Sequence, residues 1–177
     1  MSWDTYYLNI CNAVAKNSKC LSRSIGAIIV RDKSIISTGY NGPPKWVPHC
    51  GEARYLRDSN LREALNYEGP HMDLDVIDTT CPRQLLGYKS GEGLEWCIAS
   101  HAERNALINA ARYGIATDGC RMYMDCPVPC FECLKEIINA GITEVVCTKM
   151  QYYDKMSSFL IENSELNVRA YVNNDKK

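Results

Sequence analysis

The sequence predicts a three-layer α/β/α fold in which a mixed five-stranded sheet carries helices on both faces. Two observations lead to this prediction. First, two apolar segments near the start of the chain flank a short Asp-Lys turn, which is typical of a β-hairpin. Second, from residue 101 onward helical periodicity alternates with short apolar strands, as in parallel strands joined by helices. Because such crossovers are right-handed, the N-termini of the connecting helices should meet at one edge of the sheet.

The N-terminal elements are one helix and the two strands of the hairpin. Ser2 is a favourable N-cap for a helix over residues 3–16, whose apolar side chains recur on one face. Strands are expected over residues 24–30 and 34–40, because both segments are rich in β-branched and apolar residues.

The C-terminal part of the chain contains three helical and three strand patterns. Gly114 and Gly141 lie just beyond two of the helical patterns, where glycine commonly ends a helix. The expected helices cover residues 101–112, 130–140 and 154–162, and the expected strands cover residues 120–125, 143–147 and 166–172.

The middle of the chain is irregular. A helix is expected over residues 52–67, whereas residues 69–93 contain several Pro and Gly residues and no clear regular element. A stretch of this length inside a compact domain is either functional or mobile, and we interpret it as functional. We therefore expect a single domain over residues 1–177, with an irregular insertion at about 43–99 that provides binding and assembly surface.

Composition limits the classes of partner. The 177 residues carry a formal net charge of −1, so no general positive field attracts a polynucleotide, and a small ligand is favoured. There is no apolar run long enough to span a bilayer and no secretory signal at the start. We therefore expect a soluble, cytoplasmic protein with neither a polynucleotide nor a membrane partner.

One imidazole and two thiols have the spacing of a catalytic zinc site. His101 opens one helical pattern, and Cys130 and Cys133 form a Cys-x-x-Cys pair that opens the next. Three protein ligands leave the fourth position of a tetrahedral zinc ion open for water. A Cys-x-x-Cys pair alone is as often a redox pair or half of a structural zinc site, but the His on the preceding helix favours the catalytic interpretation.

Glu103 is the candidate catalytic acid–base. It lies two residues after His101, close enough to reach a zinc-bound water without ligating the metal. Zinc lowers the pKa of such a water to about 7, and a nearby carboxylate can then move protons between water and substrate.

The remaining cysteines fall into two groups. Those within apolar-periodic segments are expected to be small core residues, namely Cys11, Cys120 and Cys147. A second group lies in or beside loops and is not explained by core packing, namely Cys20, Cys50, Cys81 and Cys97.

Taken together, these motifs resemble those of the deoxycytidylate (dCMP) deaminases within the cytidine deaminase superfamily. His-x-Glu followed by Pro-Cys-x-x-Cys is the zinc signature of nucleobase deaminases. The more specific part of the resemblance is Gly39-Tyr40-Asn41-Gly42. The resemblance implies a cytidine-deaminase-like fold, a Zn²⁺ cofactor, and a homohexamer that hydrolyses dCMP to dUMP and ammonia for dTMP precursor supply.

The resemblance also implies ligand contacts. In the substrate site, Asn41 is expected at the deoxyribose, Arg23 or Ser24 near the phosphate and Tyr153 near the sugar-phosphate end, with Ala102 beside them. Allosteric activation by dCTP and inhibition by dTTP are expected at the Gly39–Gly42 segment. The triphosphate would be held with Mg²⁺ and by basic residues such as Lys45 or Arg54.

A second, structural zinc is a further implication of the resemblance. Its ligands would include Cys20, Cys50 and Cys97, with the fourth left open among His49, His71 and Cys81. The alternative is that these are unrelated buried thiols.

Two other functions compete with dCMP deamination. A deaminase of nucleic-acid bases, such as tRNA adenosine, shares the metal signature but is disfavoured by the charge balance and by Gly-Tyr-Asn-Gly. A zinc-stabilised, non-catalytic binding module is disfavoured by Glu103, because a closed site needs no unligated acid. Whether dCTP is also a substrate depends on phosphate contacts that the sequence leaves open.

Overall fold

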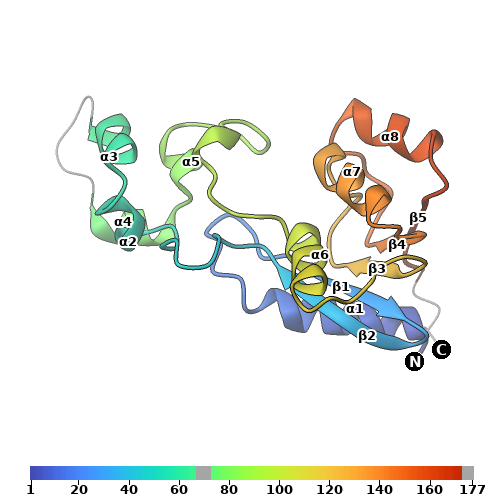
Figure 1. Ribbon diagram of the computed structural model, residues 1–177. Helices are drawn as coiled ribbons and strands as arrows, with labels where there is room; N and C mark the ends of the chain where they lie inside the picture. Colours follow the sequence, from blue (N-terminus) through green and yellow to red (C-terminus); the bar gives the residue numbers. More distant parts are fainter. Residues whose placement is uncertain (67–72, 173–177) are drawn as a thin grey trace. The chain divides into compact units, whose positions relative to one another are not determined.

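The computed structural model describes residues 1–66 and 73–172 and divides into two compact units (Figure 1). The sheet unit consists of Met1–Ser18, Ile25–Asn41 and His101–Lys177. The insertion unit consists of Lys19–Ser24 and Gly42–Ser100. Each unit is described by itself below.

The sheet unit is built on the expected mixed five-stranded sheet, with the strand order β2-β1-β3-β4-β5. β1 is antiparallel to β2 and β3, whereas β3, β4 and β5 are parallel. The strands are β1 (Gly26–Arg31), β2 (Ser34–Tyr40), β3 (Arg121–Met124), β4 (Glu144–Cys147) and β5 (Asn167–Ala170). The predicted fold class is therefore confirmed.

Helices cover both faces of this sheet. Alternate residues of each strand point to opposite faces, so Ile28 packs with α1 while Ala27 packs with α6 and α7. Figure 1 shows α1 and α6 on opposite sides of β1 and β2. The helices of the unit are α1 (Trp3–Ala15), α6 (Ala102–Arg112), α7 (Phe131–Asn139) and α8 (Lys155–Glu162). All four lie within two residues of the predicted bounds.

Local sequence signals account for the N-terminal elements. The Ser2 hydroxyl accepts a hydrogen bond from Thr5 N at 3.1 Å and caps α1, as expected. In the hairpin turn, Asp32 and Lys33 have φ angles of 46° and 65°. Two consecutive positive φ angles are the geometry of a type I′ turn, which matches the twist of the flanking strands.

Helix α6 lies unusually close to strand β2 because the facing residues are small. Ala102, Ala106 and Ala110 are fully buried along the inner side of α6. A Cβ atom on Gly39 would lie 2.3 Å from Ala106 N and 2.4 Å from Ala102 O, so only glycine allows this approach. The close approach fixes the depth at which the N-terminus of α6 meets the sheet.

The insertion unit is a set of short helices. Instead of one helix over residues 52–67, the structure has two, because Asp58 accepts a hydrogen bond from Leu61 N at 3.0 Å and starts a new helix; residue 67 lies outside the described residues. The prediction of no regular element over residues 69–93 is also wrong for its described part. Asp73 caps one short helix and Pro82 opens another. The elements are α2 (Glu52–Tyr55), α3 (Ser59–Asn66), α4 (Leu74–Thr79), α5 (Pro82–Leu85) and a 3-10 helix (Leu94–Trp96).

The apolar core of the insertion unit is small. Leu61 and Ile77 are almost fully buried, with Tyr55 and Cys81 close to that level. Arg54 is buried among them, and its guanidinium donates to Asp58 and to the carbonyl of Trp96 at 2.8 Å. In the part of the chain that the structure describes, no helix is long and apolar enough to cross a membrane.

Candidate active site and metal centre

The structure brings the three predicted metal ligands together. The ligand atoms of His101, Cys130 and Cys133 all lie within 4.8 Å of one another. His101 Nδ1 is 3.5 Å from Cys130 Sγ and 3.2 Å from Cys133 Sγ. One imidazole nitrogen and two thiol sulfurs are a donor set that fits zinc and leaves one tetrahedral position open.

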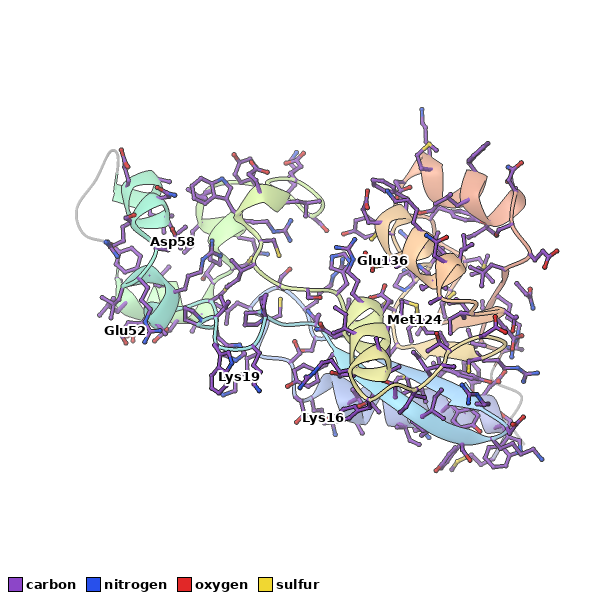
Figure 2. All side chains as sticks on the ribbon, in the orientation of Figure 1. Lys16, Lys19, Glu52, Asp58, Met124 and Glu136 are labelled. Atoms are coloured by element: carbon purple, nitrogen blue, oxygen red, sulfur yellow. The ribbon has the colours of Figure 1, made fainter. Side chains whose placement is uncertain are left out.

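The ligands converge because two helices begin at the same edge of the sheet. His101 is the N-cap residue of α6 and Cys130 is that of α7. The chain reaches α7 from the end of β3, where Asp125 Oδ1 accepts a hydrogen bond from Gly26 N at 2.7 Å. The position of the turn before Cys130 is thus tied to the start of β1. Figure 2 labels Met124, the last residue of β3.

Contacts from α8 also hold the start of α7. Asp154 accepts hydrogen bonds from Phe131 N at 3.2 Å and from Ser157 N at 2.7 Å. The Ser157 hydroxyl, which is fully buried, donates to the Pro129 carbonyl at 3.2 Å. Sequence reasoning placed a helix at Asp154 but missed this link. The spacing Asp-x-x-Ser signals an N-cap, whereas the contact with Phe131 has no signal in the sequence.

Hydrogen bonds among the three ligands shift their pKa values. The hydrogen bond with Cys133 lowers the pKa of the Cys130 thiol to about 4, against the effect of burial and with help from His101. The pKa of Cys133 is raised, first because it bonds to Cys130 and then because it is buried. The bond with Cys130 raises the pKa of His101, although burial opposes it. Thiolates and a neutral imidazole are the forms that ligate a divalent cation, so metal binding at these donors releases protons.

Glu103 lies beside the centre without belonging to the ligand cluster. It is only 4% exposed, in the first turn of α6. Because His101 is the N-cap residue of α6, Glu103 lies in the turn that directly follows this ligand, and its negative charge adds to the raised pKa of His101. A buried carboxylate beside an open metal position is the arrangement that proton transfer to and from a bound water requires.

The sheet unit holds three of the five residues expected at the substrate. Asn41 is 6% exposed, and its Oδ1 accepts a hydrogen bond from Ile25 N at 2.7 Å. Ala102 is fully buried at the start of α6, and Tyr153 is 46% exposed just before α8. Arg23 and Ser24 belong to the insertion unit and are exposed.

The Gly39–Gly42 segment is tied directly to the metal-bearing helix. Asn105 Nδ2 donates to the Tyr40 carbonyl at 2.7 Å, and Asn109 Nδ2 donates to the Thr38 carbonyl at 2.9 Å. Both asparagines lie on α6, which begins directly after His101. Asn105 lies two residues after Glu103, but nothing in the sequence assigns it this role.

The cysteines of the insertion unit surround one small cavity. Cys20, Cys50, Cys81 and Cys97 all line a cavity of about 30 Å³, together with His49. Burial raises the pKa of Cys50 although the bond with Arg54 opposes it, and the nearby thiols of Cys81 and Cys20 add to the increase. His71 lies outside the described residues. Among the residues that the structure describes, the group of three or more candidate ligands whose ligand atoms lie within 4.8 Å of one another is the one at His101.

The two basic residues expected at an effector differ in availability. Lys45 is exposed, with its ammonium 4.7 Å from the centroid of the Trp46 ring. Arg54 is buried and donates to Asp58 and Trp96 within the insertion unit.

The fold and the three-ligand centre are those expected of the cytidine deaminase class. Residues 1–149 match the family model for the cytidine and deoxycytidylate deaminase zinc-binding region. The chain therefore belongs to this family.

Several relatives bear the name deoxycytidylate deaminase. The Schizosaccharomyces pombe protein is 29% identical over 171 residues, which are 97% of this chain and 44% of the relative. The enzyme of Enterobacteria phage T4 is 33% identical over 156 residues, 84% of this chain and 77% of the relative. The chain spans less than half the length of the fungal relatives.

A solved structure confirms the fold. The dCMP deaminase of cyanophage S-TIM5, crystallised in complex with dCMP and dUMP, superimposes with a TM-score of 0.63 at 20% sequence identity. The superposition covers 94% of this chain and 95% of the phage enzyme.

Proposed function

We propose that the protein hydrolyses dCMP to dUMP and ammonia. The observation that carries the proposal is the convergence of His101, Cys130 and Cys133 beside the buried Glu103. The names of the phage and fungal relatives support dCMP as the substrate. In this reaction the C4–N bond of cytosine breaks and a C4–O bond forms, with the oxygen supplied by water.

Glu103 is assigned the proton transfers of this reaction. When bound at His101, Cys130 and Cys133, zinc supplies a Lewis acid that makes water nucleophilic at neutral pH. Glu103 accepts a proton from the attacking water and delivers it to N3 of the ring. It carries a second proton to the departing amine, which leaves as ammonia. Burial excludes bulk water from this carboxylate and keeps the protons within the site.

Substrate contacts are assigned by the family resemblance. We place Asn41 at the deoxyribose, Arg23 or Ser24 at the phosphate, and Tyr153 and Ala102 along the sugar and base. The Asn41 carbonyl accepts a hydrogen bond from Ser18 and its Oδ1 one from Ile25 N, which supports a rigid position for this side chain. As a nucleotide enzyme, the protein would work in the cytoplasm.

The test is ammonia release with dCMP, dCTP, cytidine and an adenosine-containing RNA hairpin compared side by side. The proposal expects dCMP to give the highest kcat/KM. Preference for cytidine or dCTP would overturn the assignment of the monophosphate. Activity on the hairpin alone would instead indicate a nucleic-acid deaminase, and zinc binding without any ammonia release would indicate a binding module.

Regulation by nucleotides is a second part of the proposal. We propose that the Gly39–Gly42 segment binds dCTP as an activator and dTTP as an inhibitor, with Mg²⁺ and Lys45 at the triphosphate, in a homohexamer. The bond from Asn105 to the Tyr40 carbonyl supports it, because a displacement of this segment reaches the helix that begins after His101. Effectors typically couple to a second site by about 1–3 kcal/mol, or 5–150-fold.

The test of regulation is the shape of the rate curve. Plots of rate against dCMP are expected to be sigmoidal without effector, hyperbolic with dCTP, and shifted to higher dCMP with dTTP. Hyperbolic curves that respond to neither nucleotide would show a deaminase without this regulation, and sedimentation would show whether a hexamer forms.

A structural zinc in the insertion unit is the third part of the proposal. The expected ligands Cys20, Cys50 and Cys97 line one cavity, and the same cavity is lined by Cys81, which we propose as the fourth ligand. The small apolar core of this unit supports the need for a metal, because units of this size are marginal without one.

A further inference from the structure

Arg104 connects the two helices that carry the metal ligands. It follows Glu103 on α6, and its side chain reaches across to α7. Arg104 Nε lies 3.0 Å from both carboxylate oxygens of Glu136, and a guanidinium nitrogen lies 3.8 Å from Glu132. Glu136 is labelled in Figure 2. The Arg104 side chain is 32% exposed, so this is a half-buried contact.

Both partners of Arg104 flank a metal ligand. Glu132 directly precedes Cys133 in α7, and Glu136 follows Cys133 by one turn. The Arg104 guanidinium, held by the carboxylates of Glu132 and Glu136, therefore lies against the turn of α7 that carries Cys133.

Acidic side chains flank the metal ligands on both α6 and α7. Glu103, Glu132 and Glu136 add negative charge to a site that holds two thiolates when a metal is bound. Lys135 is bonded to Glu132 at 2.8 Å on the exposed side of α7. Arg104 thus brings a positive charge from α6 to the turn of α7 that carries Cys133. An exposed ion pair alone contributes little to stability, but outer contacts of metal ligands commonly change metal affinity or activity about 10–100-fold.

We propose that Arg104 is a positioning residue of the metal centre. It spans α6 and α7, fixes the separation of His101 from the Cys130–Cys133 pair, and places a positive charge beside the two thiolate sulfurs. The inference rests on the proposed metal centre but not on dCMP as the substrate. Arg104 is not assigned any contact with substrate.

The test compares metal binding by the wild-type protein and by Arg104→Met, Arg104→Lys and Arg112→Met. Arg112 is the matched control, because it is an exposed arginine in the last turn of the same helix. Zinc release to a chromophoric chelator is expected to be about 10–100-fold faster for Arg104→Met and unchanged for Arg112→Met. Arg104→Lys is expected to fall between the two, since it keeps the charge but not the planar contact with Glu136.

A spectroscopic measurement separates charge from helix packing. With cobalt(II) in place of zinc, the sulfur-to-cobalt charge-transfer band reports the electron density on the thiolates. The band is expected to move to lower energy in Arg104→Met, because a cation near the sulfurs is lost, and to be restored in Arg104→Lys. Glu136→Gln is expected to keep most of the band energy but to release zinc faster. A purely structural contact would change the melting temperature without moving the band.

The outcomes distinguish this inference from the proposed function. If the wild type binds neither zinc nor cobalt through thiolates, the metal centre itself is wrong. If the wild type binds both, and Arg104→Met matches Arg112→Met in release rate and band energy, Arg104 is only a surface ion pair and the inference fails. If Arg104→Met does not fold, the same comparison is made with Arg104→Lys and Glu136→Gln, where unchanged zinc release in both variants would overturn it. In active protein, Arg104→Met should lower kcat and leave KM for dCMP unchanged.

Discussion

Asp154 Oδ2 accepts a hydrogen bond from the backbone N–H of Phe131 at 3.2 Å. The contact joins the N-cap of α8 to the first residue of α7, which directly follows the metal ligand Cys130. Asp154 also accepts from Ser157 N at 2.7 Å, so one carboxylate caps two helices. A residue outside the metal centre therefore holds one of its ligands in position.

Replacing Asp154 with Ala should weaken both helix ends. Loss of a cap costs about 0.5–2 kcal/mol, and here the start of α7 loses a partner as well. We expect a lower melting temperature and faster zinc release. The matched control is Asp73→Ala, which removes the cap of α4 in the insertion unit and should lower stability without changing zinc release at His101. Equal zinc release by both variants would show that Asp154 acts only on α8.

Glu103→Ala should remove turnover and keep the metal. Proton transfer by a positioned group contributes about 10²–10⁴-fold, and one carboxylate serves several transfers here, so the loss of kcat should reach at least that range. Zinc content and melting temperature measured on the same preparation provide the control. A variant that loses its zinc would show that Glu103 is a ligand and not an acid–base.

Cys130→Ser and His101→Ala should each lose the metal and the activity. Two remaining ligands do not hold a zinc ion in a three-ligand site that is open to water. Metal content after gel filtration measures the effect, and Cys120→Ser, at a fully buried core thiol, is the control for a cysteine substitution. Retention of a full zinc equivalent at this centre would contradict the ligand assignment.

The intact protein should hold more than one zinc per chain. Four cysteines line the cavity of the insertion unit, so Cys50→Ala should reduce the zinc content without changing the cobalt spectrum of the His101 centre. Cys147→Ala, a buried thiol of β4, serves as the comparison. One zinc per wild-type chain, together with rapid alkylation of Cys20, Cys50 and Cys97, would rule out the second metal.

The ion pair of Asp4 with Arg169 should make stability depend on acid pH. The hydrogen bond from Arg169 lowers the pKa of Asp4 below its ordinary value of 3.8, although burial opposes the shift. A depressed folded-state pKa stabilises the protein above 3.8, and this contribution is lost as the pH falls through the lower folded-state value. Both side chains are partly exposed, so solvent screening limits the contribution to about 1 kcal/mol.

Asp4→Asn tests this dependence by urea unfolding at several pH values. The variant should be less stable than the wild type at pH 7, and the difference should shrink as the pH approaches that of the folded-state pKa. Asp32→Asn is the control, since Asp32 is an exposed turn residue with a φ of 46°, where Asn is well tolerated. A stability difference that stays constant with pH would show that Asp4 contributes through packing alone.

The metal centre was predictable because ligand chemistry leaves few alternatives. An imidazole at the start of one helix and two thiols at the start of the next meet only where parallel strands end, so sequence order and sheet topology determined the site together. The contact between Asp154 and Phe131 was not predictable, because it joins residues 23 positions apart through their tertiary placement. The bond from Asn105 to Tyr40 was missed for the same reason, at a separation of 65 residues.

The short helices of the insertion unit were not predicted, for a different reason. Asp73 and Pro82 carry ordinary helix-start signals, but helices of six and four residues are too short to show a hydrophobic period. Arg54 shows that the burial of a charged side chain is difficult to predict from sequence. Its type and position suggested a phosphate contact, whereas the chain folds its guanidinium inward onto Asp58 and the Trp96 carbonyl.

The close approach of α6 to β2 has a consequence for how mutations in this protein are interpreted. Gly39 and Ala106 are neither metal ligands nor proposed substrate contacts, yet a larger side chain at either position should push α6 off the sheet and displace His101. A saturation library scored for activity would therefore be depleted at these positions almost as strongly as at the zinc ligands. A survey that located the active site only from positions that tolerate no substitution would assign it to the whole length of α6. It would count residues that must be small for packing as residues that take part in the reaction.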